Sequence, residues 1–251
     1  MMMYGRAKQL GQASLALILL FSVTVNSQQR TSARLAKQHY EEGVQLLAKG
    51  DLDGAIESFK KAISLAPKEG QAHASLGYAL GVKGQLTDAI AELQKAISLN
   101  PELGEAHYYL GAARWFSKDV DGAIAALRDA VRLMPQHANA HYYLGLSLQK
   151  TGDLDEAIDA FRAAIKLQPD MLPAYNDLGL ALMQKRDPEG AITAFNEALK
   201  LDSGNMVAHV TLGMVLIQKA DSAPAVEQYR RIIVQAPESA EAHYNLGLAL
   251  K

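Results

Sequence analysis

Histidine is the residue type in this sequence that is best suited to acid–base or metal chemistry, because an imidazole can move a proton or bind a metal near neutral pH. The chain has seven histidines. A catalytic group is not needed once per period, so a regular spacing of histidines indicates a repeated structural role. Six of them are separated by 34 residues or by twice that spacing, and we predict that these pack between helices: His39, His73, His107, His141, His209 and His243.

The remaining histidine, His137, lies four residues before His141, so the two side chains would share a helix face and could hold a metal ion. Two histidines without a clear third ligand make a poor zinc site. The chain has no cysteine, which excludes thiolate ligands and cysteine nucleophiles. It also lacks a glycine-rich phosphate loop, a nucleophile elbow and an H-E-x-x-H motif. The sequence thus predicts no enzyme activity, no catalytic residue, no metal site and no cofactor.

The elements that position these histidines are 34-residue repeats, which run without a phase error from Ala36. Small residues at one fixed place in each half of a repeat allow two helices to approach closely. Each repeat is therefore predicted to be a helical hairpin. The eighth place is glycine in every repeat: Gly43, Gly77, Gly111, Gly145, Gly179, Gly213 and Gly247. The twentieth place is alanine: Ala55, Ala89, Ala123, Ala157, Ala191 and Ala225.

Hydrophobic spacing and turn residues support the hairpin. In the second half of the fourth repeat, one apolar stripe follows the helical period: Ala157, Ile158, Phe161, Ala164 and Ile165. An aspartate precedes the second helix of five repeats, where we expect its carboxylate to cap free backbone N–H groups: Asp51, Asp119, Asp153, Asp187 and Asp221. Five repeats end at a proline, which stops the helix: Pro67, Pro101, Pro135, Pro169 and Pro237. Ser203 replaces this proline in the fifth repeat, so we expect a looser junction there.

This pattern resembles that of the tetratricopeptide repeat (TPR) family over residues 36–251. Histidine replaces the family's usual tryptophan, and Arg114 occupies a place that is normally apolar. The resemblance implies an all-α fold, an α-solenoid of stacked helix-turn-helix hairpins that forms a right-handed superhelix. First helices would line its concave groove, and second helices would form its outer face. The fourth repeat carries the pattern in His141, Leu144, Gly145, Leu148, Ala157, Phe161 and Pro169.

The repeat spacing also defines the predicted domain organisation. The TPR array comprises 36–69, 70–103, 104–137, 138–171, 172–205 and 206–239, with a half repeat at 240–251, and these are called repeats one to seven below. Residues 28–35 are interpreted as a short linker that leads into the first helix. Leu246, Leu248 and Leu250 lie in the last turns of the half repeat, which predicts self-association through this end or a longer native chain.

Residues 1–27 are interpreted as a secretory signal peptide. Arg6 and Lys8 precede an apolar run from Ala13 to Val25, and polar residues follow. As a helix, this run would span only about 20 Å, against roughly 30 Å of bilayer hydrocarbon. The sequence thus predicts an exported protein, periplasmic or secreted. The alternative is an uncleaved membrane anchor formed by residues 10–25, and we expect membrane contact only through this segment.

The resemblance also implies candidate groove residues. Trp115 and Phe116 follow Arg114 on the groove side of the third repeat, and large aromatic side chains often anchor binding partners. For Trp115 the alternative is a core position, with Arg114 turned outward. The lysines with which some relatives clamp a carboxyl terminus do not occur at the fifth places, which hold Tyr, Ala, Asn and Val. Four tyrosines occupy the fifth place, which faces the groove in the family: Tyr40, Tyr108, Tyr142 and Tyr244.

Composition limits the class of partner. The chain is 49% hydrophobic and 21% charged, as is usual for folded soluble proteins. Its net charge is -2, and without residues 1–27 it has 23 basic and 27 acidic residues, which argues against nucleic acid as a partner. We predict a non-catalytic scaffold that binds a protein or an extended peptide in the concave groove. The alternative is the recognition arm of an enzyme, such as a TPR-bearing glycosyltransferase, whose catalytic part lies outside this chain.

Overall fold

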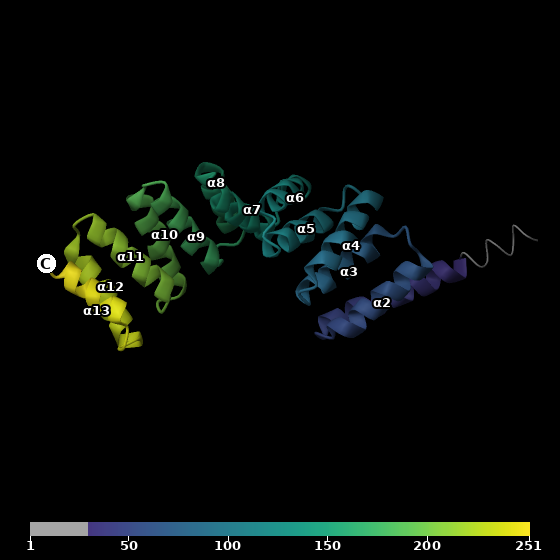
Figure 1. Cartoon of the computed structure of the whole chain (residues 1–251), viewed down its shortest axis with the longest axis horizontal. Helices are drawn as coiled ribbons and strands as arrows, with labels where there is room; N and C mark the ends of the chain where they lie inside the picture. The colour runs from purple at the N-terminus through teal and green to yellow at the C-terminus, as the bar shows by residue number, and fades with distance from the viewer. Residues whose placement is uncertain (1–29) are drawn as a thin grey trace, which may run out of the picture. The chain divides into compact units, whose positions relative to one another are not determined.

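A computed structural model describes residues 30–251, so the interpretations of residues 1–27 lie outside the described range. Helices joined by short turns make up the described residues, and no strand occurs among them (Figure 1). Within this range, no helix is long and apolar enough to cross a membrane. A first helix spans residues 30–48. It is followed by α2 (Leu52–Leu65), α3 (Gly70–Val82), α4 (Leu86–Leu99), α5 (Gly104–Phe116), α6 (Val120–Leu133), α7 (Ala138–Thr151), α8 (Leu154–Leu167), α9 (Leu172–Gln184), α10 (Pro188–Leu201), α11 (Met206–Gln218), α12 (Ser222–Gln235) and α13 (Ala240–Ala249).

The chain divides into two compact units, an amino-terminal unit that ends at Ala106 and a carboxyl-terminal unit that begins at His107. In the amino-terminal unit, α2 packs against α3 and α3 packs against α4. In the carboxyl-terminal unit, successive hairpins lie side by side, with α8 against α9 and α10 against α11 (Figure 1). First helices of neighbouring repeats also contact each other, from α7 to α9, from α9 to α11 and from α11 to α13. The predicted all-α solenoid of stacked hairpins is therefore confirmed.

The two helices of each hairpin approach closely where small residues recur. A Cβ atom at Gly77 would lie 2.6 Å from Leu93 Cγ, and one at Gly179 would lie 2.6 Å from Phe195 Cε1, so the large side chain of the second helix occupies the space above the glycine. The alanines at the twentieth place of repeats one to six are fully buried in the same contact. The close approach predicted from the small residues is confirmed.

The turns inside the hairpins only partly follow the predicted capping. The side chains of Asp51, Asp119 and Asp187 accept hydrogen bonds from the backbone N–H groups of Gly54, Gly122 and Gly190. Asp153 and Asp221 make no such bond, so the capping prediction is wrong at these two positions. The carboxylate of Asp153 instead lies 2.6 Å from the hydroxyl oxygen of Thr151, which can donate a hydrogen bond to it.

Histidines at the fourth place of a repeat form hydrogen bonds with the loop that precedes that repeat. The Nε2 atom of His141 lies 3.0 Å from the carbonyl oxygen of Pro135, which can only accept, so the ring donates this hydrogen bond. The junction at Ser203, where we expected a looser connection, keeps the same bond, from His209 at 2.9 Å. These histidines thus have a structural role at the loops. The predicted packing between helices agrees with the burial of His73 and His209, whereas His243 is exposed. The same bond joins His73 to Pro67 and His243 to Pro237.

Candidate binding surface

Side chains of neighbouring first helices contact each other in the carboxyl-terminal unit. Tyr142, at the fifth place of α7, donates a hydrogen bond of 2.8 Å to Asp177, at the sixth place of α9. The ring of Tyr108, at the fifth place of α5, lies 6.2 Å from the ring of Tyr143, at the sixth place of α7. Fifth and sixth places of neighbouring repeats therefore meet along one face. We call this the first-helix face and define it as the fifth, sixth and ninth places of α5, α7, α9, α11 and α13.

Five aromatic rings gather at the α5 and α7 end of this face, four of them at its fifth and sixth places and Phe116 beside them at the thirteenth place of α5. Phe116 meets the ring of Tyr143 edge-on at 6.0 Å, and Tyr143 lies 5.6 Å from Tyr142. Such edge-to-face pairs are favourable beyond the apolar area that they bury. Phe116 itself remains 57% exposed, so this group of rings has an edge available to a partner. We call it the aromatic cluster, and it comprises Tyr108, Tyr109, Phe116, Tyr142 and Tyr143.

Three of the six candidate residues, Tyr108, Phe116 and Tyr142, lie in the aromatic cluster. The sequence did not predict its other two members, Tyr109 and Tyr143, because tyrosines were considered at the fifth place alone. A signal for them exists in the sequence, since repeats three and four both carry a Tyr-Tyr doublet at the fifth and sixth places.

Trp115 and Phe116 are neighbours in sequence but differ in environment. Trp115 is half-buried and packs against the core of the carboxyl-terminal unit, whereas Phe116 points outward. Arg114 holds the end of α5 in this orientation, because its Nη1 donates to the carbonyl oxygen of Gly122 at 3.1 Å and its Nε lies 3.5 Å from Asp119 Oδ2. The arginine at a normally apolar place is therefore bonded to the start of the next helix.

The two remaining tyrosine candidates are not members of the aromatic cluster. Tyr244 is 68% exposed on α13. Tyr40 belongs to the amino-terminal unit, where its ring lies 5.8 Å from that of Phe59. The hydroxyl of Ser75 donates to the Tyr40 hydroxyl at 3.4 Å, which repeats the contact between the fifth and sixth places of consecutive repeats.

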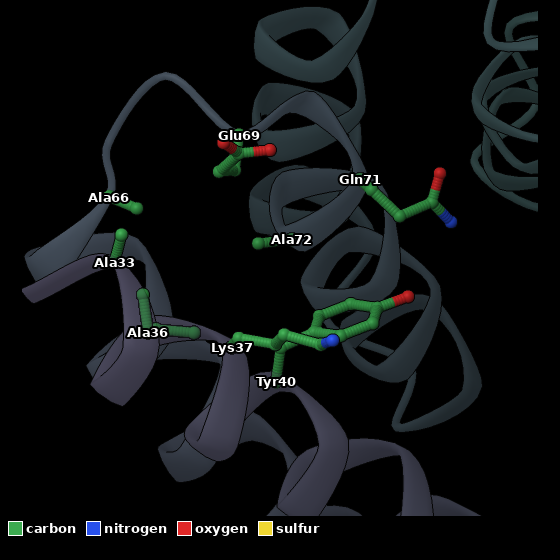
Figure 2. A pocket seen from close by; sticks show the side chains of 9 residues that line it. Ala33, Ala36, Lys37, Tyr40, Ala66, Glu69, Gln71 and Ala72 are labelled. Atoms are coloured by element: carbon green, nitrogen blue, oxygen red, sulfur yellow. The ribbon is translucent and has the colours of Figure 1, made fainter. Parts of the chain in front are cut away.

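Tyr40 also lines a hollow of about 360 Å³ in the amino-terminal unit. Figure 2 shows Ala33, Ala36 and Tyr40 on the helix over residues 30–48, with Ala72 of α3 opposite. Alanine methyl groups make up much of its lining, and the charged groups at it are Lys37 and Glu69. This hollow offers apolar contact and no arrangement of acid, base and nucleophile.

Polar groups on the first-helix face are perturbed by burial. Withdrawal from water raises the pKa of Asp177, and the hydrogen bond from Tyr142 opposes this shift. Burial also raises the pKa of Tyr143 and, together with the negative charge of Asp177, that of Tyr142. Next to Asp177, the Oδ1 atom of Asn176 is buried and has no hydrogen-bond partner within residues 30–251. The face therefore holds one hydrogen-bond acceptor, Asn176 Oδ1, that the described residues do not satisfy.

The histidine pair considered for a metal has other roles. His137 accepts a hydrogen bond of 3.1 Å from the backbone N–H of Ala140 through Nδ1, and so caps α7. Its ring also lies 4.5 Å from that of Tyr108, while His141 is bonded to the loop before α7. In the part of the chain that the structure describes, no group of three or more potential ligands could hold a metal ion.

Comparisons with known proteins agree with the geometry. Models of the tetratricopeptide repeat match residues 110–171, 142–205 and 210–250, and further TPR models match residues 82–115 and 36–69. A comparison with curated protein sequences found no match.

Solved structures that resemble the chain include MamA, with 32% identity over 67% of this chain and 92% of that one, at a TM-score of 0.61. YrrB, described as a TPR protein with an unusual peptide-binding site, has 25% identity over 68% of this chain and 88% of its own, at a TM-score of 0.60. PilF of Pseudomonas aeruginosa has 17% identity over 85% of this chain and 97% of its own, at a TM-score of 0.71, and shows the fold alone.

Proposed function

Because this chain belongs to the tetratricopeptide repeat family, we propose that it is a non-catalytic scaffold that binds a protein or an extended peptide on its first-helix face. The observation that carries this proposal is the aromatic cluster, which joins two repeats and leaves Phe116 57% exposed. Aromatic side chains of this kind are frequent anchors in protein interfaces. The likeness to YrrB, described as having a peptide-binding site, supports the same class of ligand.

The chemistry of the face favours an apolar ligand. Of its fifteen residues only Asp177 is charged, whereas 21% of the whole chain is charged. Met214 and Leu248, at the ninth places of α11 and α13, are 38% and 39% exposed. An extended peptide can lay apolar side chains along such a surface while its backbone bonds to polar groups beside it.

Selection of peptides tests this function. The purified protein would be used to select binders from a random peptide library, and the affinity of each selected peptide would be measured for Phe116→Ala. We expect this variant to weaken binding by on the order of 2 kcal/mol, as for an interface anchor. Val234→Ala is the matched control, because Val234 is also apolar and 81% exposed but lies on the second helix α12. Equal losses in both variants, or no selected peptide, would overturn the proposal.

Export is a second part of the proposed function. The basic residues Arg6 and Lys8 and the apolar run Ala13 to Val25 support removal of residues 1–27 after translocation. Amino-terminal sequencing of the protein from its native source tests this. A start near residue 28 is the expected result. Intact Met1 in a soluble cytoplasmic fraction would contradict export, and intact Met1 in a membrane fraction would support an anchor at residues 10–25.

Self-association through α13 is the third part. Leu248 on this helix and Leu250 just after it are 39% and 62% exposed, and water contact with apolar side chains favours their burial against a second surface. Sedimentation analysis is expected to show concentration-dependent association that Leu250→Glu abolishes. A protein that remains monomeric at all concentrations would contradict it.

A further inference from the structure

Asp177 is the single charged residue on the first-helix face. It is half-buried on α9, and its Oδ2 accepts the hydrogen bond of 2.8 Å from the Tyr142 hydroxyl. In residues 30–251, no Lys, Arg or His forms an ion pair with this carboxylate, although more exposed carboxylates in the first turns of α8 and α10 do have cations. Asp155 pairs with Lys185, and Glu189 pairs with Lys219. Asp177 is thus withdrawn from water and has no counter-charge among residues 30–251.

Desolvation makes such a carboxylate receptive to a cation. Removing a carboxylate from water costs free energy unless a positive group or hydrogen-bond donors replace the lost hydration. The raised pKa of Asp177 has this burial as its main cause. A ligand that carries a positive charge to Asp177 would relieve this cost.

Asn176 supplies a second acceptor beside it. Its Oδ1 is buried and has no hydrogen-bond partner in the part of the chain that the structure describes. Asn176 occupies the fifth place of α9, which is the place of Tyr142 in α7, so it belongs to the same face. A buried carbonyl oxygen without a donor is unfavourable. Rotation of the Asn176 amide towards the face would let a ligand N–H group satisfy it.

The aromatic cluster favours the same kind of ligand. Tyr142 is bonded to Asp177 and lies 5.6 Å from Tyr143, which in turn lies 6.0 Å from Phe116. The face of an aromatic ring is electron-rich and attracts ammonium and guanidinium groups. Carboxylate, amide oxygen and rings therefore all select a cation, and they disfavour an anionic group such as a phosphate.

We propose that Asp177 and Asn176 form a cation subsite on the first-helix face, which takes an ammonium or guanidinium group of an otherwise apolar peptide. The inference rests on the proposed peptide-binding function and names one element of the ligand. A lysine or arginine side chain and a free amino terminus present the same chemistry, and the experiment distinguishes them.

The test uses peptides selected from a random library by the wild-type protein. Each would be synthesised with a free or acetylated amino terminus, and with its basic residues kept or replaced by glutamine. Binding to the wild-type protein, Asp177→Asn and Asp159→Asn would be followed by fluorescence anisotropy. Asparagine keeps an oxygen that accepts the Tyr142 hydrogen bond, so Asp177→Asn removes the charge and retains the contact. Asp159 is the control because it is an exposed carboxylate on the second helix α8.

We expect Asp177→Asn to weaken binding of the cationic peptides about tenfold, as for a lost hydrogen bond to a charged group, and Asp159→Asn to leave it unchanged. Peptides without the cation should bind the wild-type protein and Asp177→Asn equally, because the interaction between the cation and the carboxylate is then absent. A loss of affinity on acetylation alone identifies the free amino terminus as the bound cation. A loss of affinity on glutamine replacement identifies a lysine or arginine side chain. Selected peptides that lack any cation, or that bind Asp177→Asn as tightly as the wild type, overturn the inference alone. Failure to select any peptide, or peptides insensitive to Phe116→Ala, overturns the proposed function, and the subsite with it.

Discussion

Gly145 on α7 lies directly against the ring of Phe161 on α8, so that a Cβ atom at Gly145 would be 2.7 Å from Phe161 Cδ1. Real Cβ contacts are longer than this, and the ring is fully buried, so it has little room to move away. The equivalent glycine of the half repeat, Gly247, has no atom within 4 Å of the position where a Cβ would lie. The same sequence position thus has opposite steric requirements in two repeats.

We therefore expect Gly145→Ala to destabilise the fold and Gly247→Ala to leave it unchanged or stabilise it. Overpacking costs about 1–3 kcal/mol, and the gain in helix propensity from glycine to alanine returns about 1 kcal/mol. At Gly145 the first effect is the larger, whereas only the second acts at Gly247. Denaturant unfolding of both variants measures the difference, and a Gly145→Ala protein as stable as the Gly247→Ala protein would contradict the prediction.

Removal of the Tyr229 hydroxyl is expected to stabilise the protein. Tyr229 occupies the place held by Phe161 and Phe195 in earlier repeats, is fully buried, and its hydroxyl has no hydrogen-bond partner among the described residues. Tyr229→Phe deletes this unsatisfied group, so the free energy of unfolding should rise by about 1 kcal/mol. Tyr244→Phe, at an exposed tyrosine, should have no effect.

We also expect Tyr229 to make the folded protein less stable in alkali. Burial, with a contribution from the charge of Glu241, raises the pKa of Tyr229 to about 12. The unfolded chain then releases the tyrosine proton at a lower pH than the folded protein does, so stability falls as pH rises from the ordinary tyrosine pKa towards 12. Denaturation measured against pH should show a smaller alkaline loss for Tyr229→Phe than for the wild type. Parallel curves would show that the hydroxyl titrates freely.

Alanine substitutions of Trp115 and Phe116 should have different effects, the first on stability and the second on peptide binding. Trp115 packs half-buried against the core, so Trp115→Ala is expected to lower the free energy of unfolding by about 2 kcal/mol, below the range for a fully buried aromatic residue. Phe116→Ala should change stability little, because more than half of this side chain is exposed. Thermal melts of both variants, measured beside peptide titrations, provide the comparison. If Trp115→Ala kept full stability and lost binding instead, Trp115 would be an anchor of the face.

Asp177→Asn is expected to stabilise the protein near neutral pH. The folded state holds the Asp177 proton at a higher pH than the unfolded chain, because burial raises this pKa. Stability from this group is therefore present at low pH, where the carboxyl is protonated, and decreases as pH rises from the ordinary carboxyl pKa to the raised one. The advantage of Asp177→Asn over the wild type should shrink as pH falls through this window. An advantage that does not vary with pH would mean that charge burial is not its cause.

The hairpins and their stacking follow from the sequence alone, because the features that specify them are local and recur. A glycine at the eighth place, an alanine at the twentieth and a proline at the junction act within one repeat or between neighbours, and their recurrence removes ambiguity about the fold. The periodic histidines could be assigned to structure for the same reason. His141 confirms this, since its ring bonds only six residues back along the chain.

What the tertiary structure decided concerns side-chain direction and contacts between repeats. Trp115 and Phe116 are adjacent in one helix, and the orientation of α5 decides which of the two side chains packs against the core. Arg114 bonds the end of α5 to Gly122 and Asp119. Tyr142 and Asp177 are 35 residues apart, and their hydrogen bond exists only because α7 packs against α9. A sequence pattern specifies which residues share a helix face, whereas the distances between faces, and the burial that raises the pKa of Asp177, arise only when the repeats pack together.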